Sequence, residues 1–353
     1  MSSSPARTLF RKVGFPTSRD LVSSAGGHGC TRTARRVRHI VQVAFLALFS
    51  ACTQASPSSK APIEQAVVTP SAAGKKIARP FAGQIVAIGD LHGDLEASLK
   101  VLKLAGLVND AGHWSGGRTV FVQTGDTTDR GPDSKGVIEL LMRLSVEAED
   151  AGGRVVALLG NHEIMNLTGD WRYVHPGDVA AFGSPEQRRA ALAPDGELGR
   201  WLRQRDVVAK VGDTVFVHGG VSPAWAERGI DAINGAARVA IDAEPRARVL
   251  GSEGPLWLRD YLQAPPSIAC PMLADALASL GAARMVVGHT TQRTGRVATR
   301  CEGALLGIDT GISAHYGGNL SAIRIEAGNA LAVYRTEVED LPDPTVAPTS
   351  HTP

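Results

Sequence analysis

Five short segments of the chain combine aspartate, asparagine or histidine with glycine. They are Gly89-Asp90-Leu91-His92-Gly93-Asp94, Gly125-Asp126-Thr127-Thr128-Asp129-Arg130-Gly131, Gly160-Asn161-His162-Glu163, Val217-His218-Gly219-Gly220 and Gly288-His289-Thr290. Carboxylate, amide and imidazole groups, with no thiolate among them, are ligands that suit Mn, Fe or Zn. Glycine lets the backbone turn sharply and lets a phosphate approach it. If the five segments meet in space, they predict a metal centre for a phosphate-containing substrate.

The first three segments each follow a short apolar run of the kind that forms a buried strand. These runs cover residues 84–88, 119–122 and 154–159, and helix-like patterns over 95–107 and 137–144 separate them. A strand, a crossover helix and a second strand in succession predict parallel pairing. In an open α/β sheet, ligands bind at the carboxyl ends of the strands. We therefore expect the five segments to converge on one rim.

The rest of the chain divides by composition. Further strands are expected at 214–217, 284–287, 304–308 and 321–334, the last two as a meander. One domain is predicted over 81–337, preceded by a leader over 1–52 and a disordered Ser/Pro/Ala-rich linker over 53–80. Residues 338–353 contain four prolines and are predicted to be a frayed, disordered tail.

The motifs resemble the signatures of the calcineurin-like metallophosphoesterases. Asp129-Arg130-Gly131 and the stretch His218-Gly219-Gly220-Val221-Ser222-Pro223 resemble the phosphoprotein phosphatase branch. Residues 254–259 (Gly-Pro-Leu-Trp-Leu-Arg) and 308–318 resemble the Shewanella-like bacterial protein phosphatases within that branch. The resemblance covers roughly residues 84–325. It implies an enzyme with a four-layer α/β sandwich, in which helices flank two central mixed sheets.

The resemblance also implies a set of metal ligands. Two divalent ions are expected, Mn first, with Fe or Zn as alternatives. Asp90 and His92 would bind one ion, and Asp126 would bridge both. The second ion would take Asn161, His218 and His289. Two such ions can share one water, lower its pKa and hold the phosphoryl oxygens for in-line attack.

Other residues of the motifs would act on the phosphate ester itself. His162 is expected to be the general acid for the leaving-group oxygen, with Asp129 holding its ring oriented. Arg130 would bind phosphate oxygens through two parallel hydrogen bonds, a task that lysine cannot match. Asn161 is expected to contact phosphate as well as metal.

The sequence departs from the eukaryotic members of the branch after the third motif. Those proteins continue with Ser-Arg, whereas this chain has Ile164-Met165-Asn166, so one phosphate-binding arginine is missing from its usual place. We expect Arg259 to replace it. Two groups of residues either contact a phosphorylated side chain or only pack their loops. They are Asn166, Asp170, Trp171, Arg172 and Tyr173 after the third motif, and the pair His315 and Tyr316.

Three functions are compatible with these residues. The first is a phosphomonoester hydrolase, above all a protein phosphatase for phosphoserine, phosphothreonine or phosphotyrosine, which could also accept small phosphoesters. The second is a dinucleoside polyphosphate hydrolase, whose family shares the first three motifs. A non-catalytic scaffold is disfavoured because no expected ligand is missing and His162 and Asp129 are both present. The net charge of +2 gives no electrostatic case for nucleic acid.

The N-terminal region predicts export. Residues 39–51 form an apolar run with an Arg-rich lead-in, as in a secretory signal peptide. Cys52 follows Phe49-Ser50-Ala51, which resembles a bacterial lipoprotein cleavage box. The expected location is extracytoplasmic and periplasmic, with membrane attachment only through a lipidated Cys52; a downstream start or an organellar transit segment remain alternatives.

Cys270 and Cys301 are either bridged or two buried thiols.

Overall fold

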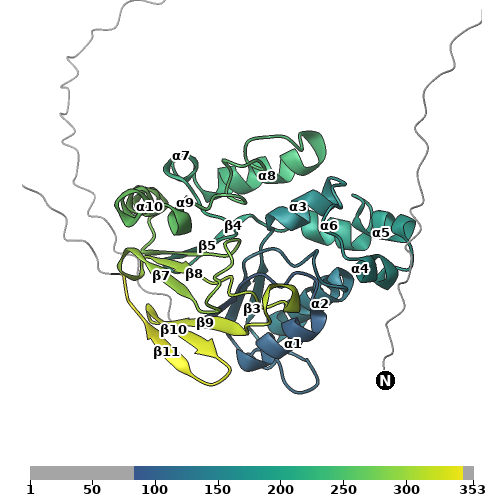
Figure 1. The fold of residues 1–353 in the computed structure, drawn as a ribbon, viewed down its shortest axis with the longest axis horizontal. Coiled ribbons are helices and arrows are strands. Elements are labelled where there is room, and N and C mark those ends of the chain that lie inside the picture. Colours follow the sequence, from purple (N-terminus) through teal and green to yellow (C-terminus); the bar gives the residue numbers. More distant parts are fainter. Residues whose placement is uncertain (1–82, 345–353) are drawn as a thin grey trace, which may run out of the picture. The chain divides into compact units, whose positions relative to one another are not determined.

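The computed structural model describes residues 83–344 of the chain (Figure 1). The predicted leader with the apolar run 39–51 and Cys52, the linker 53–80 and residues 345–353 lie outside the described residues. Within 83–344, no helix has the length and apolar character needed to cross a bilayer.

The strands form two mixed sheets. The six-stranded sheet has the order β11-β10-β9-β1-β2-β3, and the five-stranded sheet has the order β4-β5-β6-β8-β7. The strands are β1 (Gln84–Ile88), β2 (Val120–Gln123), β3 (Arg154–Ala157), β4 (Val208–Val211), β5 (Thr214–Val217), β6 (Arg284–Val287), β7 (Ala298–Arg300), β8 (Leu305–Gly307), β9 (Ser321–Glu326), β10 (Asn329–Tyr334) and β11 (Val338–Leu341).

The helices connect the strands and cover the sheets (Figure 1). They are α1 (Leu95–Leu104), α2 (Ser134–Asp150), α3 (Asn161–Leu167), α4 (Pro176–Ala181), α5 (Pro185–Leu192), α6 (Glu197–Arg203), α7 (Pro223–Ala226), α8 (Ile230–Ala243), α9 (Asp260–Gln263) and α10 (Pro266–Leu280), with 3-10 turns η1 (Cys301–Gly303) and η2 (Ala314–Tyr316).

Alternation along the strands explains the four layers. Because successive side chains of a strand point to opposite faces, Ile85 and Ala87 of β1 enter the core between the two sheets. Val86 and Ile88 point the other way and pack against α1 and α2. In the second sheet, Val215 and Val217 of β5 pack toward α8 and α10. The predicted α/β sandwich of two mixed sheets flanked by helices is confirmed.

The first sheet contains the predicted parallel strands. β1 pairs with β2, and β2 with β3, both in parallel, because α1 and α2 provide the crossovers. Aspartates at the ends of the preceding loops start both helices: Asp94 accepts a hydrogen bond from Ala97 N, and Asp133 from Gly136 N. These caps fix the loops that leave the carboxyl ends of β1 and β2.

Two predictions about the C-terminal part were wrong. The segments around 304–308 and 321–334 do not form one meander, because β8 joins the second sheet while β9 and β10 extend the first. The predicted frayed tail begins too early, since residues 338–341 form β11, paired with β10 from Ala330↔Leu341 to Val333↔Val338. The charged, exposed face of β11 makes it resemble a linker in sequence.

Candidate metal centre

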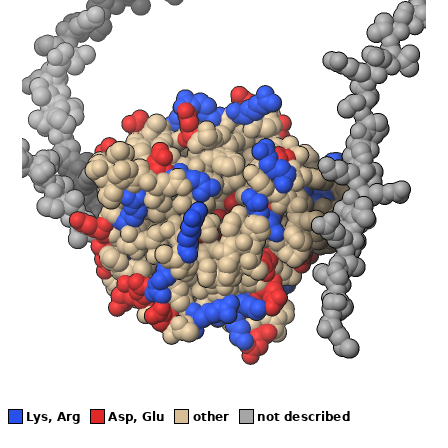
Figure 2. All heavy atoms as spheres, viewed as in Figure 1, with Lys and Arg blue, Asp and Glu red and all other residues tan. Residues whose placement is uncertain are grey.

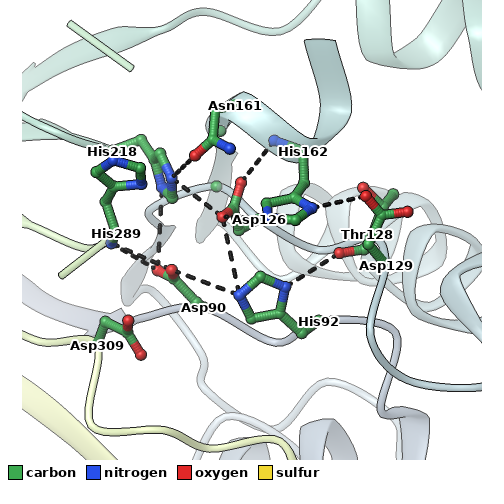
Figure 3. A network of polar contacts seen from close by, with 12 residues as sticks. Asp90, His92, Asp126, Thr128, Asp129, Asn161, His162, His218, His289 and Asp309 are labelled. Carbon is green, nitrogen blue, oxygen red and sulfur yellow. Dashed lines mark hydrogen bonds and ion pairs between the residues drawn. The ribbon is translucent and has the colours of Figure 1, made fainter. Parts of the chain in front are cut away.

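The polar segments lie at the carboxyl ends of parallel strands in both sheets. β1, β2 and β3 lead into the first three segments, and β5 and β6 lead into the last two. The structure brings the six predicted ligands into one site, each at most 5% exposed (Figure 3). They are Asp90, His92, Asp126, Asn161, His218 and His289.

Asp126 lies at the centre of this group. Its Oδ2 atom is 3.2 Å from Nε2 of His218, 3.8 Å from Nε2 of His92 and 3.9 Å from Nε2 of His162. Two sets of ligand atoms, each within 4.8 Å of one another, share this carboxylate: one with His92 and His162, the other with His218 and His289. A carboxylate between two ligand sets can bridge two ions.

The histidine rings are oriented by backbone carbonyls. His92 donates from Nδ1 to Thr128 O at 3.2 Å, and His218 donates from Nδ1 to Thr124 O at 3.0 Å. In each ring Nδ1 therefore carries a proton and Nε2 is turned toward the site, the orientation that metal-ligating histidines take when their other nitrogen donates to a carbonyl. His218 Nε2 also lies 3.0 Å from Oδ1 of Asn161.

The charges of the site fit cations. Burial raises the pKa of Asp90 well above its ordinary value, and repulsion from Asp309 and Asp126 raises it further. Burial lowers the pKa of His92 to about 4 and that of His289 to about 2, so both rings are neutral and able to bind metal. Nε2 of His289 and Oδ2 of Asp309 are buried without a hydrogen-bond partner. Crowded carboxylates, neutral imidazoles and unpaired atoms are the donor set of a divalent metal centre.

Glu163 orders the backbone of the second motif. Its carboxylate accepts hydrogen bonds from the N–H groups of Asp126, Thr127 and Thr128, and from Gly160 N at 2.7 Å. The hydroxyls of Thr127 and Thr128 also donate to it. One fully buried side chain thus holds the loop that carries Asp126 and Asp129.

The ligand loops have unusual backbone conformations. Within 83–344, positive φ angles at non-glycine residues include five positions of the motifs: His92, Asp126, Asp129, Arg130 and His289. Each such residue costs about 1 to 3 kcal/mol and persists where the surrounding structure imposes it. The glycines of the motifs leave space for the ligands, since a Cβ on Gly160 would lie 2.2 Å from Oδ1 of Asp126.

The predicted acid and its partner form a close pair. Nδ1 of His162 lies 2.6 Å from Oδ2 of Asp129, and both residues are buried. Burial of the ring lowers the pKa of His162, but Asp126 and then Asp129 raise it by more, so it stays above its ordinary value. The two carboxylates thus favour the protonated form of the ring, whose Nε2 lies on the side of Asp126.

The two predicted phosphate-binding arginines also lie at the site. Arg130 stacks on Tyr173, with 3.9 Å between the guanidinium carbon and the ring centre, and its Nε is buried without a partner. Arg259 donates from Nη1 to the carbonyl of His289 at 2.6 Å. In Figure 2, several Lys and Arg side chains lie around a hollow near the middle of the face, and atoms of Asp or Glu are visible inside it.

Aromatic rings flank the histidines. The ring of Tyr316 is 4.8 Å from that of His92, and the ring of Tyr173 is 5.2 Å from that of His162. Both tyrosines are half-buried, so their rings are available to a substrate. Asn166, by contrast, is buried behind Asp129 and does not face the hollow.

Sequence reasoning gave no role to Asp309 or Glu163. Asp309 follows β8 in an Asp-Thr-Gly turn, the same strand-end pattern that marks Asp90 and Asp126, and this signal could have identified it. Glu163 is part of the third motif, but its bonds to residues 126–128 cannot be read from spacing.

Comparisons with known proteins agree with this geometry. A family model described as calcineurin-like phosphoesterase matches residues 83–293. An uncharacterized protein from Schizosaccharomyces pombe is 37% identical over 276 residues, which cover 73% of this chain and 82% of that protein. Shewanella-like protein phosphatase 2 from Arabidopsis thaliana is 35% identical, over 65% of this chain and 71% of its own. The cold-active protein tyrosine phosphatase of a psychrophilic Shewanella species superposes with a TM-score of 0.66 at 30% identity, covering 73% and 80% of the two chains.

Nucleotide-hydrolysing proteins match a shorter part of the chain. A symmetrical bis(5'-nucleosyl)-tetraphosphatase from an Acidovorax species is 32% identical over 149 residues, or 39% of this chain and 44% of that protein.

Proposed function

The chain belongs to the calcineurin-like phosphoesterase family, and from this membership we propose that it is a protein phosphatase whose centre holds two divalent metal ions. The observation that carries the proposal is the meeting of the six predicted ligand side chains with the His162–Asp129 pair at one buried edge of the sheets. A phosphoesterase needs the metal ligands for the phosphate and the histidine–aspartate pair for the leaving group.

The ligands that we assign add Asp90 and Asn161 to the two sets of atoms that share Asp126, and leave out His162, which we assign as the acid. Asp90 and His92 would hold one ion, and Asn161, His218 and His289 the other, with Asp126 between them. When bound, such ions supply Lewis acidity at the phosphoryl oxygens and lower the pKa of a water between them. Mn is our first expectation, with Fe or Zn as alternatives.

His162 would protonate the leaving-group oxygen. Its Nδ1 proton is donated to Asp129, so in the imidazolium form the Nε2 proton is the one that can be given away. A positioned acid of this kind contributes about 100- to 10,000-fold to the rate. Arg130 and Arg259, with Asn161, would bind the phosphate oxygens and hold the ester in line with the attacking water.

The substrate we propose is a phosphorylated protein side chain. The relatives named as protein phosphatases match most of the folded domain, whereas the tetraphosphatase matches a shorter part. Tyr173 and Tyr316 provide ring surfaces on which an aromatic leaving group can pack. We therefore rank phosphotyrosine ahead of phosphoserine and phosphothreonine.

One activity panel tests this proposal. Peptides of one sequence with phosphotyrosine, phosphoserine or phosphothreonine would be compared with a dinucleoside tetraphosphate, after metal analysis of the purified protein. We expect about two divalent ions per chain and the highest kcat/KM on phosphotyrosine. Faster turnover of the dinucleotide would favour the nucleotide hydrolase. Equal rates for the wild type and His162→Ala would favour a scaffold with contaminating activity.

For location, we propose export to the periplasm with an anchor at a lipidated Cys52. The Cys270–Cys301 disulfide supports an oxidising compartment, because disulfides are rare in the cytosol. Cell fractionation and the N-terminus of the mature protein test the proposal. A full-length cytosolic product would contradict it.

A further inference from the structure

A fully buried ion pair lies behind the proposed acid. Nε of Arg188 on α5 donates to Oδ2 of Asp178 on α4 at 2.8 Å, and neither side chain has any exposed area. Arginine and aspartate are almost never fully buried unless paired, and burying both is costly. The rings of Trp171 and Phe182 lie 4.9 and 5.4 Å from the guanidinium carbon and help to enclose it.

Arg188 fixes the orientation of a second buried side chain. Its Nη2 donates to Oδ1 of Asn166 at 2.6 Å. The nitrogen of this amide therefore points away from Arg188 and donates to Oδ1 of Asp129 at 2.9 Å and to the carbonyl of His162 at 2.8 Å. Both oxygens of Asp129 are thus bound, one by Asn166 and the other by the ring of His162.

The contacts close into a ring of hydrogen bonds. Asp129 N donates to Oγ of Ser134 at 3.0 Å, and Ser134 N donates to Oδ1 of Asp178 at 2.6 Å. Asp129 is therefore tied to Asp178 by two routes, one through Ser134 and one through Arg188 and Asn166. The Ser134 route fixes the backbone of Asp129 and the Asn166 route fixes its carboxylate, so the histidine partner of this carboxylate has one orientation.

We propose that Asn166 and Arg188 are positioning residues that aim His162 at the leaving group; this rests on the proposed function. In the hydrolysis step, a water oxygen bonds to phosphorus as the P–O bond to the leaving group breaks. The Nε2 proton of His162 passes to the departing oxygen, and a proton from the attacking water restores the imidazolium.

Without Arg188 the amide of Asn166 can turn over and present its oxygen to Asp129, and the repulsion displaces Asp129 and then His162.

Leaving-group dependence separates this role from a merely structural one. Phenyl phosphate releases a phenol of high pKa, near the value of about 10 for tyrosine, and needs the proton. 2,4-Dinitrophenyl phosphate releases a much more acidic phenol and needs none. Damage to the fold or to metal binding slows the hydrolysis of both substrates, whereas an acid in the wrong orientation slows only the hydrolysis of phenyl phosphate.

The variants are Asn166→Ala and Arg188→Lys, with Arg189→Met as the matched control. Lysine keeps the charge of Arg188 but cannot reach Asp178 and Asn166 at once. Arg189 is the next residue of α5, is exposed and also stacks on Trp171, but takes no part in the ring. Metal content and thermal unfolding are measured for every variant, and His162→Ala serves as the reference for loss of the acid.

We expect Asn166→Ala and Arg188→Lys to lower kcat on phenyl phosphate by about 10- to 100-fold, the usual loss when a residue that orients a functional side chain is removed, and on the dinitrophenyl ester by less than about threefold. Arg189→Met should change neither rate. Equal losses on both substrates, or no loss, would overturn the proposal, and Asn166→Ala alone decides it if Arg188→Lys does not fold. A wild type inactive on both esters, or a His162→Ala variant that slows both equally, would instead refute the proposed function.

Discussion

His162 and Asp129 are 33 residues apart in sequence, yet their ring nitrogen and carboxylate oxygen lie 2.6 Å apart in the interior of the protein. Asp129 has a positive φ, and His162 lies in the first turn of α3, so both backbones are constrained where the pair forms. The pair is built on the same loops that carry Asp126 and Asn161. The proposed acid and the proposed metal ligands are therefore positioned together.

His162→Ala should remove the proposed acid and leave the proposed metal centre intact. Because a general acid contributes about 100- to 10,000-fold, we expect kcat on a phosphopeptide to fall within that range. Asp129→Asn should lower kcat as well, because the ring loses the carboxylate that orients it. His175→Ala, a change at an exposed histidine that caps α4, is the control. Loss of bound metal in His162→Ala would assign the residue to the ligands instead.

Gly288→Ala should impair metal binding although it changes no ligand. A Cβ at this position would lie 2.3 Å from Oδ1 of Asp90 and 2.9 Å from Oγ1 of Thr124, too close for either atom. The control is Gly235→Ala on α8, where a Cβ would meet nothing within 4 Å. Titration calorimetry with Mn²⁺ on both folded variants measures the effect. Wild-type affinity in Gly288→Ala would show that Asp90 can move without cost.

The motif residues could be placed from sequence because each follows a strand. Parallel strands separated by helices put Asp90, Asp126 and Asn161 at one edge, and this needs only the order of the elements. The predicted ends of these strands lie within one or two residues of the observed ends, because the apolar runs stop where the polar residues of the motifs begin.

The residues that sequence could not place act through tertiary contacts. Arg188 lies in a strongly polar helix, where arginine is normally exposed, and nothing in its spacing indicates a partner 22 residues away. β11 has three exposed residues of four, so its pairing with β10 has no apolar pattern to reveal it. The Cys270–Cys301 disulfide depends on a Cα separation, here 5.3 Å, that spacing cannot supply.

Asp309→Asn should weaken metal binding and stabilise the metal-free protein. Oδ1 of Asp309 accepts from Gly311 N at 3.1 Å, a bond that asparagine can keep, while Oδ2 is buried and unpaired. Removing the charge relieves its repulsion of Asp90 but takes a negative charge from beside the ions. We expect a loss of about 10- to 100-fold in Mn²⁺ affinity, the usual effect of changing a residue that supports metal ligands, and a higher unfolding temperature in chelator.

The contrasting control is Asp340→Asn, at an exposed carboxylate on β11, which should change neither quantity. If Asp309→Asn binds Mn²⁺ as tightly as the wild type, Asp309 contributes nothing to the metal centre.

The disulfide should contribute to stability but not to catalysis. It joins Cys270 on α10 to Cys301 in η1 across 31 residues, and a loop of that length corresponds to about 3 to 4 kcal/mol in the chain-entropy estimate. The double variant Cys270→Ser and Cys301→Ser should lose about that much free energy of unfolding in urea. Its kcat should match the wild type, because neither residue lies in the ligand loops. An unchanged urea midpoint would contradict the expectation.

Glu147 on α2 should give part of the stability a defined pH dependence. Burial alone would raise the pKa of Glu147, but the hydrogen bonds from Trp114 N, His113 and Arg143 outweigh it and lower the pKa to about 2. Since the folded value lies below the value of about 4.3 in an unfolded chain, the carboxylate stabilises the fold above that pH. This contribution is lost as the pH falls from there toward 2.

Glu147→Gln should therefore be less stable than the wild type at pH 7, and the difference should shrink below about pH 4.3. Urea unfolding of both proteins between pH 7 and pH 3 measures it, with Glu139→Gln on the exposed side of α2 as the control. A difference that stays constant over this range would show that the hydrogen bonds of Glu147 do not depend on its charge.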